Sequence, residues 1–297
     1  MSPAGPTFPL VPRRRVAGIA FGGMRSSRRG PGVDPAGTRP YRSGDDVRRI
    51  DHRASARLSA ALGSDEFVVR EHLTEEAARV VVAVDRRPSM ALFPPELPWL
   101  SKPRAIVEAG MLVVESAAAA RCLPGFLDAG AWVPPDGRCE PWRLEECLHR
   151  DVADTGDVLA ALALHERALP PGSFVFLLSD FLAFPPDDAW EEALSRGWDV
   201  VPVVIQDPVW ERSFPAVGGA VLPLVDPATG RGGAVRLRRA EAEARARANE
   251  ARLAAILGRF DAMGLDGVEL PAADPDAVLE AFLGWADGRQ SGRRLAV

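Results

Sequence analysis

The chain has 297 residues, of which 47% are hydrophobic and 26% are charged, and its formal net charge is −5. This composition supplies enough apolar material for a large core and excludes a disordered protein. Three cysteines without a Cys-x-x-Cys pair argue against a disulfide scaffold, and no run of about 18 apolar residues indicates a membrane span. We expect a cytoplasmic protein, because prolines and arginines fill residues 1–15, where a signal peptide needs an apolar core.

Positive charge is concentrated near the start of the sequence. Residues 1–57 contain 12 arginines and 4 aspartates, a balance of +8, so the rest of the chain carries −13. Residues 1–30 are rich in Pro, Gly, Ser and Arg, which predicts a poorly ordered basic arm. Nucleic acid is disfavoured as a partner, since few aromatic residues interleave with these arginines and no nucleic-acid motif occurs.

Residues 31–78 are predicted to form an irregular extension with a short strand at Glu66–Glu71. Residues 79–290 then alternate between strands and helices, which predicts right-handed crossovers and a mostly parallel α/β sheet with helices on both faces. The expected strands are Val80–Val84, Phe126–Val133, Phe174–Leu178, Asp199–Ile205 and Gly267–Leu270. The expected helices are Arg104–Arg121, Asp154–Leu169, Asp187–Ser195, Val235–Met263 and Pro275–Asp287.

Polar residues follow two of these apolar strands directly. Asp85 comes after Val80–Val84, and Asp180 comes soon after Phe174–Leu178. Because ligands of open α/β sheets bind at the carboxyl ends of the strands, we expect both aspartates at one functional edge. The first loop reads Asp-Arg-Arg-Pro-Ser over residues 85–89, and it resembles the metal-site opening Asp-x-Ser-x-Ser of von Willebrand factor A-type domains.

A second segment, residues 41–57, resembles the hallmark region of the domain-of-unknown-function 58 family. The family pattern is Tyr-x-x-Gly-Asp-Asp-x-Arg-x-Ile-Asp-Trp-x-x-x-Ala-Arg, and His52 stands at the tryptophan. The matching residues are Tyr41, Gly44, Asp45, Asp46, Arg48, Ile50, Asp51, Ala56 and Arg57. The resemblance covers roughly residues 30–285. It implies a von Willebrand A-like (Rossmann-like) domain behind an N-terminal extension, and partnership with a MoxR-type AAA+ ATPase and an unknown client.

The resemblance also implies a set of loop residues at the sheet edge. In related domains a magnesium ion is bound by first-loop hydroxyls, a second-loop threonine and a third-loop aspartate. The corresponding residues here are Asp85, Ser89, Thr155 and Asp180, with Arg87 in place of the first serine.

A guanidinium has no lone pair to donate to a metal. Beside Asp85 and Asp180 it would instead supply the positive charge, through charge-assisted hydrogen bonds. Our hypothesis is therefore a metal-free edge in which Arg87 is the built-in cation, with no cofactor. The alternative is that Arg87 turns to solvent and magnesium binds weakly at Asp85, Ser89, Thr155 and Asp180.

The hallmark block (residues 41–57) has two interpretations that the sequence leaves open. In the first, Gly44 permits a turn, Asp45 caps a helix start, and the charged residues form ion pairs on a solvated face. In the second, the block is a partner-docking surface, because an exposed alternation of both charges suits recognition. The docking candidates are Tyr41, Asp45, Asp46, Arg48, Asp51 and Arg57.

Nothing in the sequence has the spacing of a catalytic motif. The four histidines show no metal-ligand spacing, no Gly-x-Ser-x-Gly occurs, and the only lysine, Lys102, lacks the glycines of a phosphate loop. An arginine between Asp85 and Asp180 would keep both ionised, which makes a poor general acid. We therefore expect a non-enzymatic protein-interaction module, and the alternative is a metal-dependent hydrolase or nucleotide-binding enzyme that uses the same sheet edge.

Overall fold

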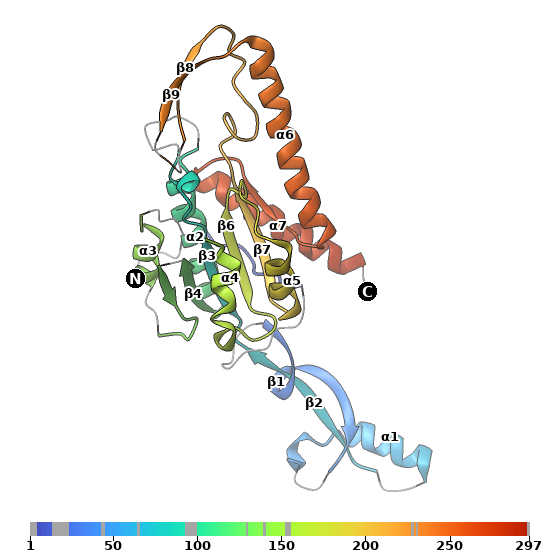
Figure 1. Ribbon diagram of the computed structural model, residues 1–297. Coiled ribbons are helices and arrows are strands. Elements are labelled where there is room, and N and C mark those ends of the chain that lie inside the picture. Colours follow the sequence, from blue (N-terminus) through green and yellow to red (C-terminus); the bar gives the residue numbers. More distant parts are fainter. Residues whose placement is uncertain are drawn as a thin grey trace.

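The structure is a computed structural model that describes residues 5–13, 24–42, 45–63, 66–92, 100–128, 130–138, 141–151, 156–226, 229 and 231–295. Figure 1 shows a central α/β body with a protrusion at each end. One protrusion contains β1, β2 and α1, and the other contains β8, β9 and the first half of α6.

A six-stranded sheet forms the centre of the body, in the order β10-β7-β6-β3-β4-β5. All neighbours are parallel except β4 and β5. From β3 the chain crosses to β4 on one side, and it later returns to β6 on the other side, so the topological switch point lies between β3 and β6. The strands are β3 (Arg79–Val84), β4 (Leu123–Asp128), β5 (Ala131–Val133), β6 (Phe174–Ser179), β7 (Asp199–Ile205) and β10 (Val268–Leu270).

Helices cover both faces of this sheet, as the alternation of elements predicted. Val80, Val82 and Val84 of β3 belong to one hydrophobic cluster with α2 and α7, while Val81 and Ala83 belong to a second cluster with α4, α5 and α6. Successive strand residues point to opposite faces, so a continuously apolar strand serves both clusters. The helices are α2 (Lys102–Ala119), α3 (Pro141–Leu148), α4 (Val158–Ala163), α5 (Asp187–Ser195), α6 (Arg239–Ala262) and α7 (Pro275–Leu295).

Several element boundaries differ from the expectation. The segment Phe126–Val133 was expected to be a single strand. It instead contains the end of β4 and the whole of β5, which pair as an antiparallel hairpin. The helix expected at Asp154–Leu169 is divided between α4 and a 3-10 helix at Glu166–Ala168. A hairpin of β8 (Val221–Val225) and β9 (Gly232–Arg236) precedes α6, so this helix begins at Arg239 rather than at the expected Val235.

The N-terminal extension is an antiparallel ribbon of β1 (Met24–Pro40) and β2 (Val68–Glu76). Between these strands lie a 3-10 helix, Val47–Arg49, and α1 (His52–Leu62), whereas the sequence indicated only a helix start near Asp45. Glu76 at one end of the ribbon is followed directly by β3, so the ribbon begins at the amino ends of the sheet strands. The hallmark block therefore lies at the opposite end of the molecule from the carboxyl edge (Figure 1).

The first described residues pack on the body instead of forming a poorly ordered arm. Phe8 is 3% exposed, and its ring lies 4.7 Å from Phe282 and 5.8 Å from Trp285 between centroids. Leu10 and Val11 are buried in the same cluster. The apolar run at residues 8–11 explains this packing, because burying it covers the face formed by α2 and α7. Residues 1–4 and 14–23 of the expected arm lie outside the described part of the chain.

Candidate functional site

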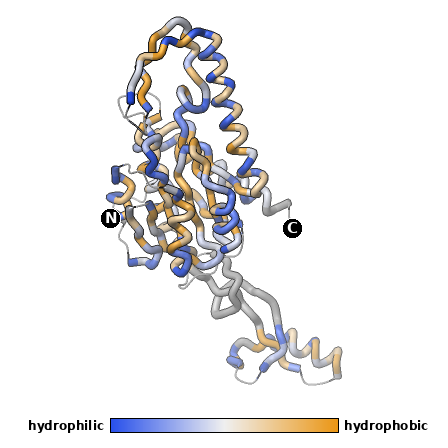
Figure 2. Tube along the Cα trace, in the orientation of Figure 1, coloured by the Kyte–Doolittle hydropathy of each residue, from blue (hydrophilic) through white to orange (hydrophobic). Residues whose placement is uncertain are grey.

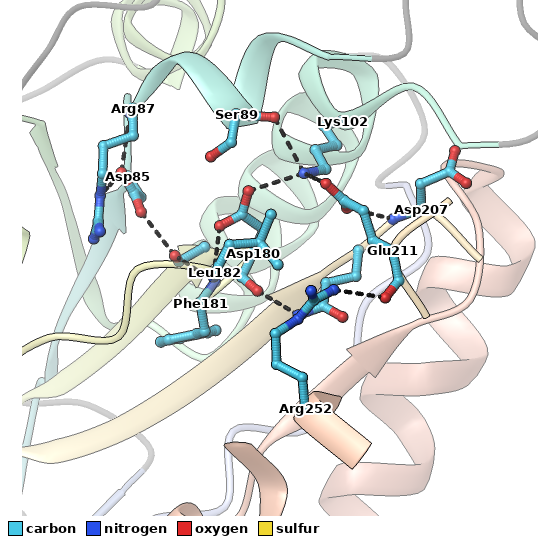
Figure 3. Close-up of polar contacts among 12 residues, drawn as sticks. Asp85, Arg87, Ser89, Lys102, Asp180, Phe181, Leu182, Asp207, Glu211 and Arg252 are labelled. Atoms are coloured by element: carbon cyan, nitrogen blue, oxygen red, sulfur yellow. Dashed lines mark hydrogen bonds and ion pairs between the residues drawn. The ribbon is translucent and has the colours of Figure 1, made fainter. Parts of the chain in front are cut away.

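Asp85 lies at the carboxyl end of β3, where it is 1% exposed. One carboxylate oxygen accepts a hydrogen bond from Ser179 Oγ at 2.8 Å. The other accepts from the backbone N of Arg87 at 3.0 Å and from its Nε at 3.1 Å (Figure 3). Arg87 also donates to the carbonyl of Ala183 at 2.6 Å. Both oxygens of Asp85 are thus engaged, and Arg87 connects the loops after β3 and β6.

The cation beside Asp180 is Lys102, at the start of α2, and not Arg87. Its Nζ lies 2.9 Å from Asp180 Oδ2, 2.6 Å from Glu211 Oε1 and 3.1 Å from the carbonyl oxygen of Ser89. The lysine is fully buried, with 0% exposure. Figure 3 shows the ammonium at the centre of these three acceptors, which come from the loops after β3, β6 and β7. The expectation that one arginine lies beside both aspartates is therefore corrected for Asp180.

The choice of lysine at this position has a physical reason. Lys102 is the only lysine in the sequence, and the other 35 of the 36 Lys and Arg residues are arginine. An ammonium is compact and carries three hydrogens that rotate as a group, whereas a guanidinium is a planar fork. Three acceptors converging on one enclosed point fit the ammonium. The N-terminal turn of a helix disfavours positive charge, so the neighbouring carboxylates are needed to stabilise it.

The loop after β7 holds Glu211, the second carboxylate that contacts Lys102, and Asp207 shapes this loop. Asp207 accepts the backbone N–H groups of Val209 and Trp210 at 2.8 Å each, which closes a tight turn. The backbone N–H of Asp207 donates to Glu211 Oε2 at 2.8 Å, and Arg252 of α6 donates to the Glu211 carbonyl at 2.8 Å. Burial raises the pKa of the Glu211 carboxyl above its ordinary value, while the Lys102 ammonium acts in the opposite direction.

The turn after β6 directs Asp180 towards this cluster. Phe181 has a φ of 53°, in the left-handed region that a bulky side chain rarely adopts. Its N–H donates to Ser179 Oγ at 3.0 Å, and the N–H of Leu182 donates to Asp180 Oδ1 at 3.0 Å. The Phe181 ring is buried 5.0 Å from Phe260 between centroids, and this packing holds the turn against a strain of roughly 1–3 kcal/mol.

The predicted edge residues are thus brought together only in part. Asp85 and Asp180 lie at the same edge but bind different cations, and Ser89 contacts Lys102 through its carbonyl rather than its hydroxyl. Thr155 lies outside the described residues. The roles of Lys102 and Glu211 were not predicted from the sequence. Two signals could have found them: the isolated lysine, and the Asp-Pro that follows the strand Asp199–Ile205.

The described residues of this edge do not fit a magnesium ion. Magnesium requires oxygen ligands in octahedral geometry, but the Lys102 ammonium lies between the Asp180 and Glu211 oxygens. Asp85 is bound by Ser179 and Arg87. In the described parts of the chain, no group of three or more His, Cys, Asp or Glu side chains could hold a metal ion. What the arrangement can do is fix three loops in one geometry.

In the hallmark block, Asp45 forms an ion pair rather than a helix cap. Arg39 donates to both of its oxygens at 2.6 Å, and the backbone N–H of Arg42 donates at 2.7 Å. The hydrogen bonds from Arg39 and Arg42 lower the pKa of Asp45 to about 2. The expected capping role falls to its neighbours, since Asp46 caps the 3-10 helix and Asp51 caps α1.

The remaining block residues divide between backbone support and exposed surface. The Tyr41 N–H donates to the carbonyl of Phe67 at 2.8 Å, which pairs the end of β1 with the start of β2. Arg48, His52 and Arg57 are exposed. Gly44 lies outside the described residues. The block therefore presents a polar surface with local capping, and both earlier interpretations keep a structural basis.

A family model described as "Protein of unknown function DUF58" matches residues 37–255. The chain belongs to this family. The match includes both the hallmark block and the carboxyl edge of the DUF58 chain. No curated protein and no solved structure matches the DUF58 chain. Among its described helices, none is long and apolar enough to span a membrane.

Proposed function

We propose that this DUF58 chain is a non-enzymatic protein-interaction module with a von Willebrand A-like domain, and that it acts as an adaptor between a MoxR-type AAA+ ATPase and a client protein. One observation carries the proposal. At the carboxyl edge, cations of the chain itself contact three buried carboxylates: Arg87 pairs with Asp85, and Lys102 pairs with both Asp180 and Glu211.

These ion pairs oppose the enzymatic alternative. A general acid or base needs a proton it can exchange and room for a substrate, and a nucleotide or metal needs free positive or negative groups. Here Lys102 is fully buried and both carboxylates that contact it are at most 6% exposed. In this reading the edge is a degenerate metal site, in which Lys102 and Arg87 together take the electrostatic role of the ion.

The same arrangement supports docking, because a surface that is already fixed loses little conformational entropy on binding. The Arg87 side chain is 23% exposed, so the edge presents to a partner a guanidinium that Asp85 and the Ala183 carbonyl fix in place. A cavity of about 660 Å³ adjoins it, lined by Arg86, Met90, Arg104 and Leu148 among others. An apolar side chain of the partner fits such a cavity beside the charged edge.

The experiment is affinity capture of the tagged full chain from its native lysate with ATP and magnesium. The test variant is Arg87→Ala at the exposed part of the edge, and the matched control is Arg57→Ala in the hallmark block. Enrichment of an AAA+ ATPase by wild type and control, with loss in Arg87→Ala, supports the proposal. Loss in Arg57→Ala alone would assign docking to the hallmark block, and capture without any ATPase would contradict the adaptor role.

A further inference from the structure

The β8–β9 hairpin is a ribbon that packs on no other strand. It forms a two-stranded sheet by itself in the described part of the chain. All of its residues are exposed except Leu222, which is half-buried. Figure 1 shows it projecting from the body beside the N-terminal half of α6. Because an isolated two-stranded ribbon is marginally stable in water, this element gains stability when something else covers it.

Both faces of the ribbon are apolar. Residues paired across an antiparallel ribbon share a face, so the register fixes two sets. One face contains Val221, Pro223, Val225 and Ala234, with Arg236 opposite Val221 at its end, and the other contains Leu222, Leu224 and Val235. Val221 is 59% exposed and Val225 is 61% exposed. Figure 2 shows the hydrophobic colour along β8. A ribbon that packed on the body of the protein would instead have one apolar face and one polar face.

The two edges of the ribbon differ in their backbone groups. Hydrogen bonds from Asp226 N to the Arg231 carbonyl and from Leu237 N to the Ala220 carbonyl, both 2.9 Å, set the alternation along the ribbon. With this alternation the backbone groups of Pro223 point away from β9. Proline has no N–H, so the outer edge of β8 is blunted at its centre.

The outer edge of β9 is open by the same reasoning. The outward backbone groups belong to Gly232, Ala234 and Arg236, and each has an N–H donor. No described residue forms a hydrogen bond with these outward groups. The small residues Gly232, Gly233 and Ala234 leave the backbone accessible from both faces. An extended chain can therefore form backbone hydrogen bonds with the outer edge of β9 more readily than with the outer edge of β8.

Charge near β9 indicates what kind of chain would add. Arg236 lies in this strand and Arg231, Arg238 and Arg239 flank it in the sequence, and of these Arg239 pairs with Glu243, whereas the whole protein carries a net charge of −5. Acidic residues flanking the added strand would complement these arginines. Pairing of β9 with β9 of a second copy would bring the two arginine clusters together, and like charges disfavour that arrangement.

We propose that the open edge of β9 binds an extended segment of a partner protein by strand addition. The segment is apolar in its middle, to extend both apolar faces, and acidic at its ends. This binding site goes beyond the adaptor role assigned to the carboxyl edge, because it uses a different element and does not require an ATPase.

The decisive variant is Ala234→Pro. It removes an outward N–H of β9 and leaves the β8–β9 hydrogen bonds intact, because the Ala234 N–H points away from β8. The matched control is Pro223→Ala, which restores a donor on the other edge. The probe is a short synthetic peptide with a valine–isoleucine core and a pair of glutamates at each end, and a lysine-flanked version serves as its counterpart. Binding of the labelled peptide to the full chain is followed by fluorescence anisotropy.

We expect the glutamate-flanked peptide to bind wild type and Pro223→Ala alike, and to bind Ala234→Pro about tenfold more weakly. Its binding should also slow amide hydrogen exchange at Ala234 and Arg236, which a merely structural role would not explain. Equal binding by Ala234→Pro, or no binding to wild type, would overturn the proposal. Equally tight binding of the lysine-flanked peptide would remove its charge argument. A concentration-dependent dimer that Ala234→Pro abolishes would show a second copy to be the occupant instead.

Discussion

The carboxyl edge and the hallmark block are both rich in charged residues, yet they use charge in different ways. At the edge, the partners are far apart in the sequence: Lys102 binds Asp180 and Glu211, which are 78 and 109 residues away. In the block, Asp46 binds the backbone of Arg48, two residues away. The edge network is buried and holds segments of the fold together, whereas the block contacts shape local turns at an exposed tip. Loss of an edge contact should therefore weaken the whole body, and loss of a block contact should remain local.

The largest expected effect follows removal of the buried ammonium. Lys102→Met leaves Asp180 and Glu211 buried without their cation, which costs about 3–5 kcal/mol of unfolding free energy. Chemical denaturation followed by circular dichroism measures this loss. The control is Arg104→Met on the exposed face of the same helix, which should change stability by no more than about 0.5 kcal/mol. Equal effects of the two substitutions would contradict the central role of the buried contact.

A smaller effect tests whether Lys102 or Arg87 prevents a metal ion from binding at the carboxyl edge. With both cations removed, in Lys102→Ala combined with Arg87→Ser, carboxylate and hydroxyl oxygens face one another. Magnesium at roughly ten times its Kd would then raise the unfolding free energy by about 1.4 kcal/mol, which a thermal shift assay detects. Arg87→Ser alone should give no magnesium response, because Lys102 still lies between Asp180 and Glu211. A response of the single variant would assign the blocking role to Arg87.

In the hallmark block, we expect a local effect of moderate size. Asp51 accepts the backbone N–H groups of Arg53 and Ala54 at 3.1 Å each and so caps α1. Asp51→Ala should destabilise that helix by about 1 kcal/mol. Amide hydrogen exchange should accelerate in α1 while exchange in β3 and β6 stays unchanged. Accelerated exchange in the central sheet would show that the block and the body unfold together.

The smallest effect concerns the proton on Asp45. Its pKa is lowered to about 2 from the ordinary 3.8, so its contribution to stability is present above pH 3.8 and is lost as the pH falls towards 2. A carboxyl titration by NMR measures the value directly. Arg39→Gln should return the pKa towards 3.8, because Arg39 is the largest cause of the shift. An unchanged titration in that variant would exclude the ion pair as the cause.

Glu211 at the edge should respond to pH with the opposite sign. Burial raises its pKa above the ordinary 4.5, so its contribution to stability is present below pH 4.5 and is lost as the pH rises towards the folded-state value. In Glu211→Gln, the unfolding free energy should therefore fall less steeply with rising pH above 4.5 than it does in wild type. A pH dependence identical to that of wild type would mean that Glu211 keeps its ordinary pKa.

The same contrast explains what the sequence could predict. Periodicity identified β3, β6, β7 and α5 within one or two residues, because apolar runs and local breakers determine these elements. The strand-end positions of Asp85 and Asp180 followed from the parallel sheet. The partner of Asp180 did not, since no local pattern shows which of the cations reaches a buried carboxylate from 78 residues away.

Two further misses have local causes. Pro, Gly and Arg dominate the surroundings of Phe8 and predict a poorly ordered arm, whereas its own apolar neighbours supply the packing energy. The sequence does not indicate the β8–β9 hairpin, because both of its faces are exposed and neither shows the alternation that indicates a half-buried strand.

The burial of Lys102 gives the chain an unusual chemical property. The chain has a single ε-amine, and in the folded protein that amine is shielded from solvent. Amine-acylating reagents should therefore leave the Lys102 side chain of the native body untouched and modify it only when the loops around it separate. Lysine modification at that one position would then report directly how often the body opens, without any label being introduced.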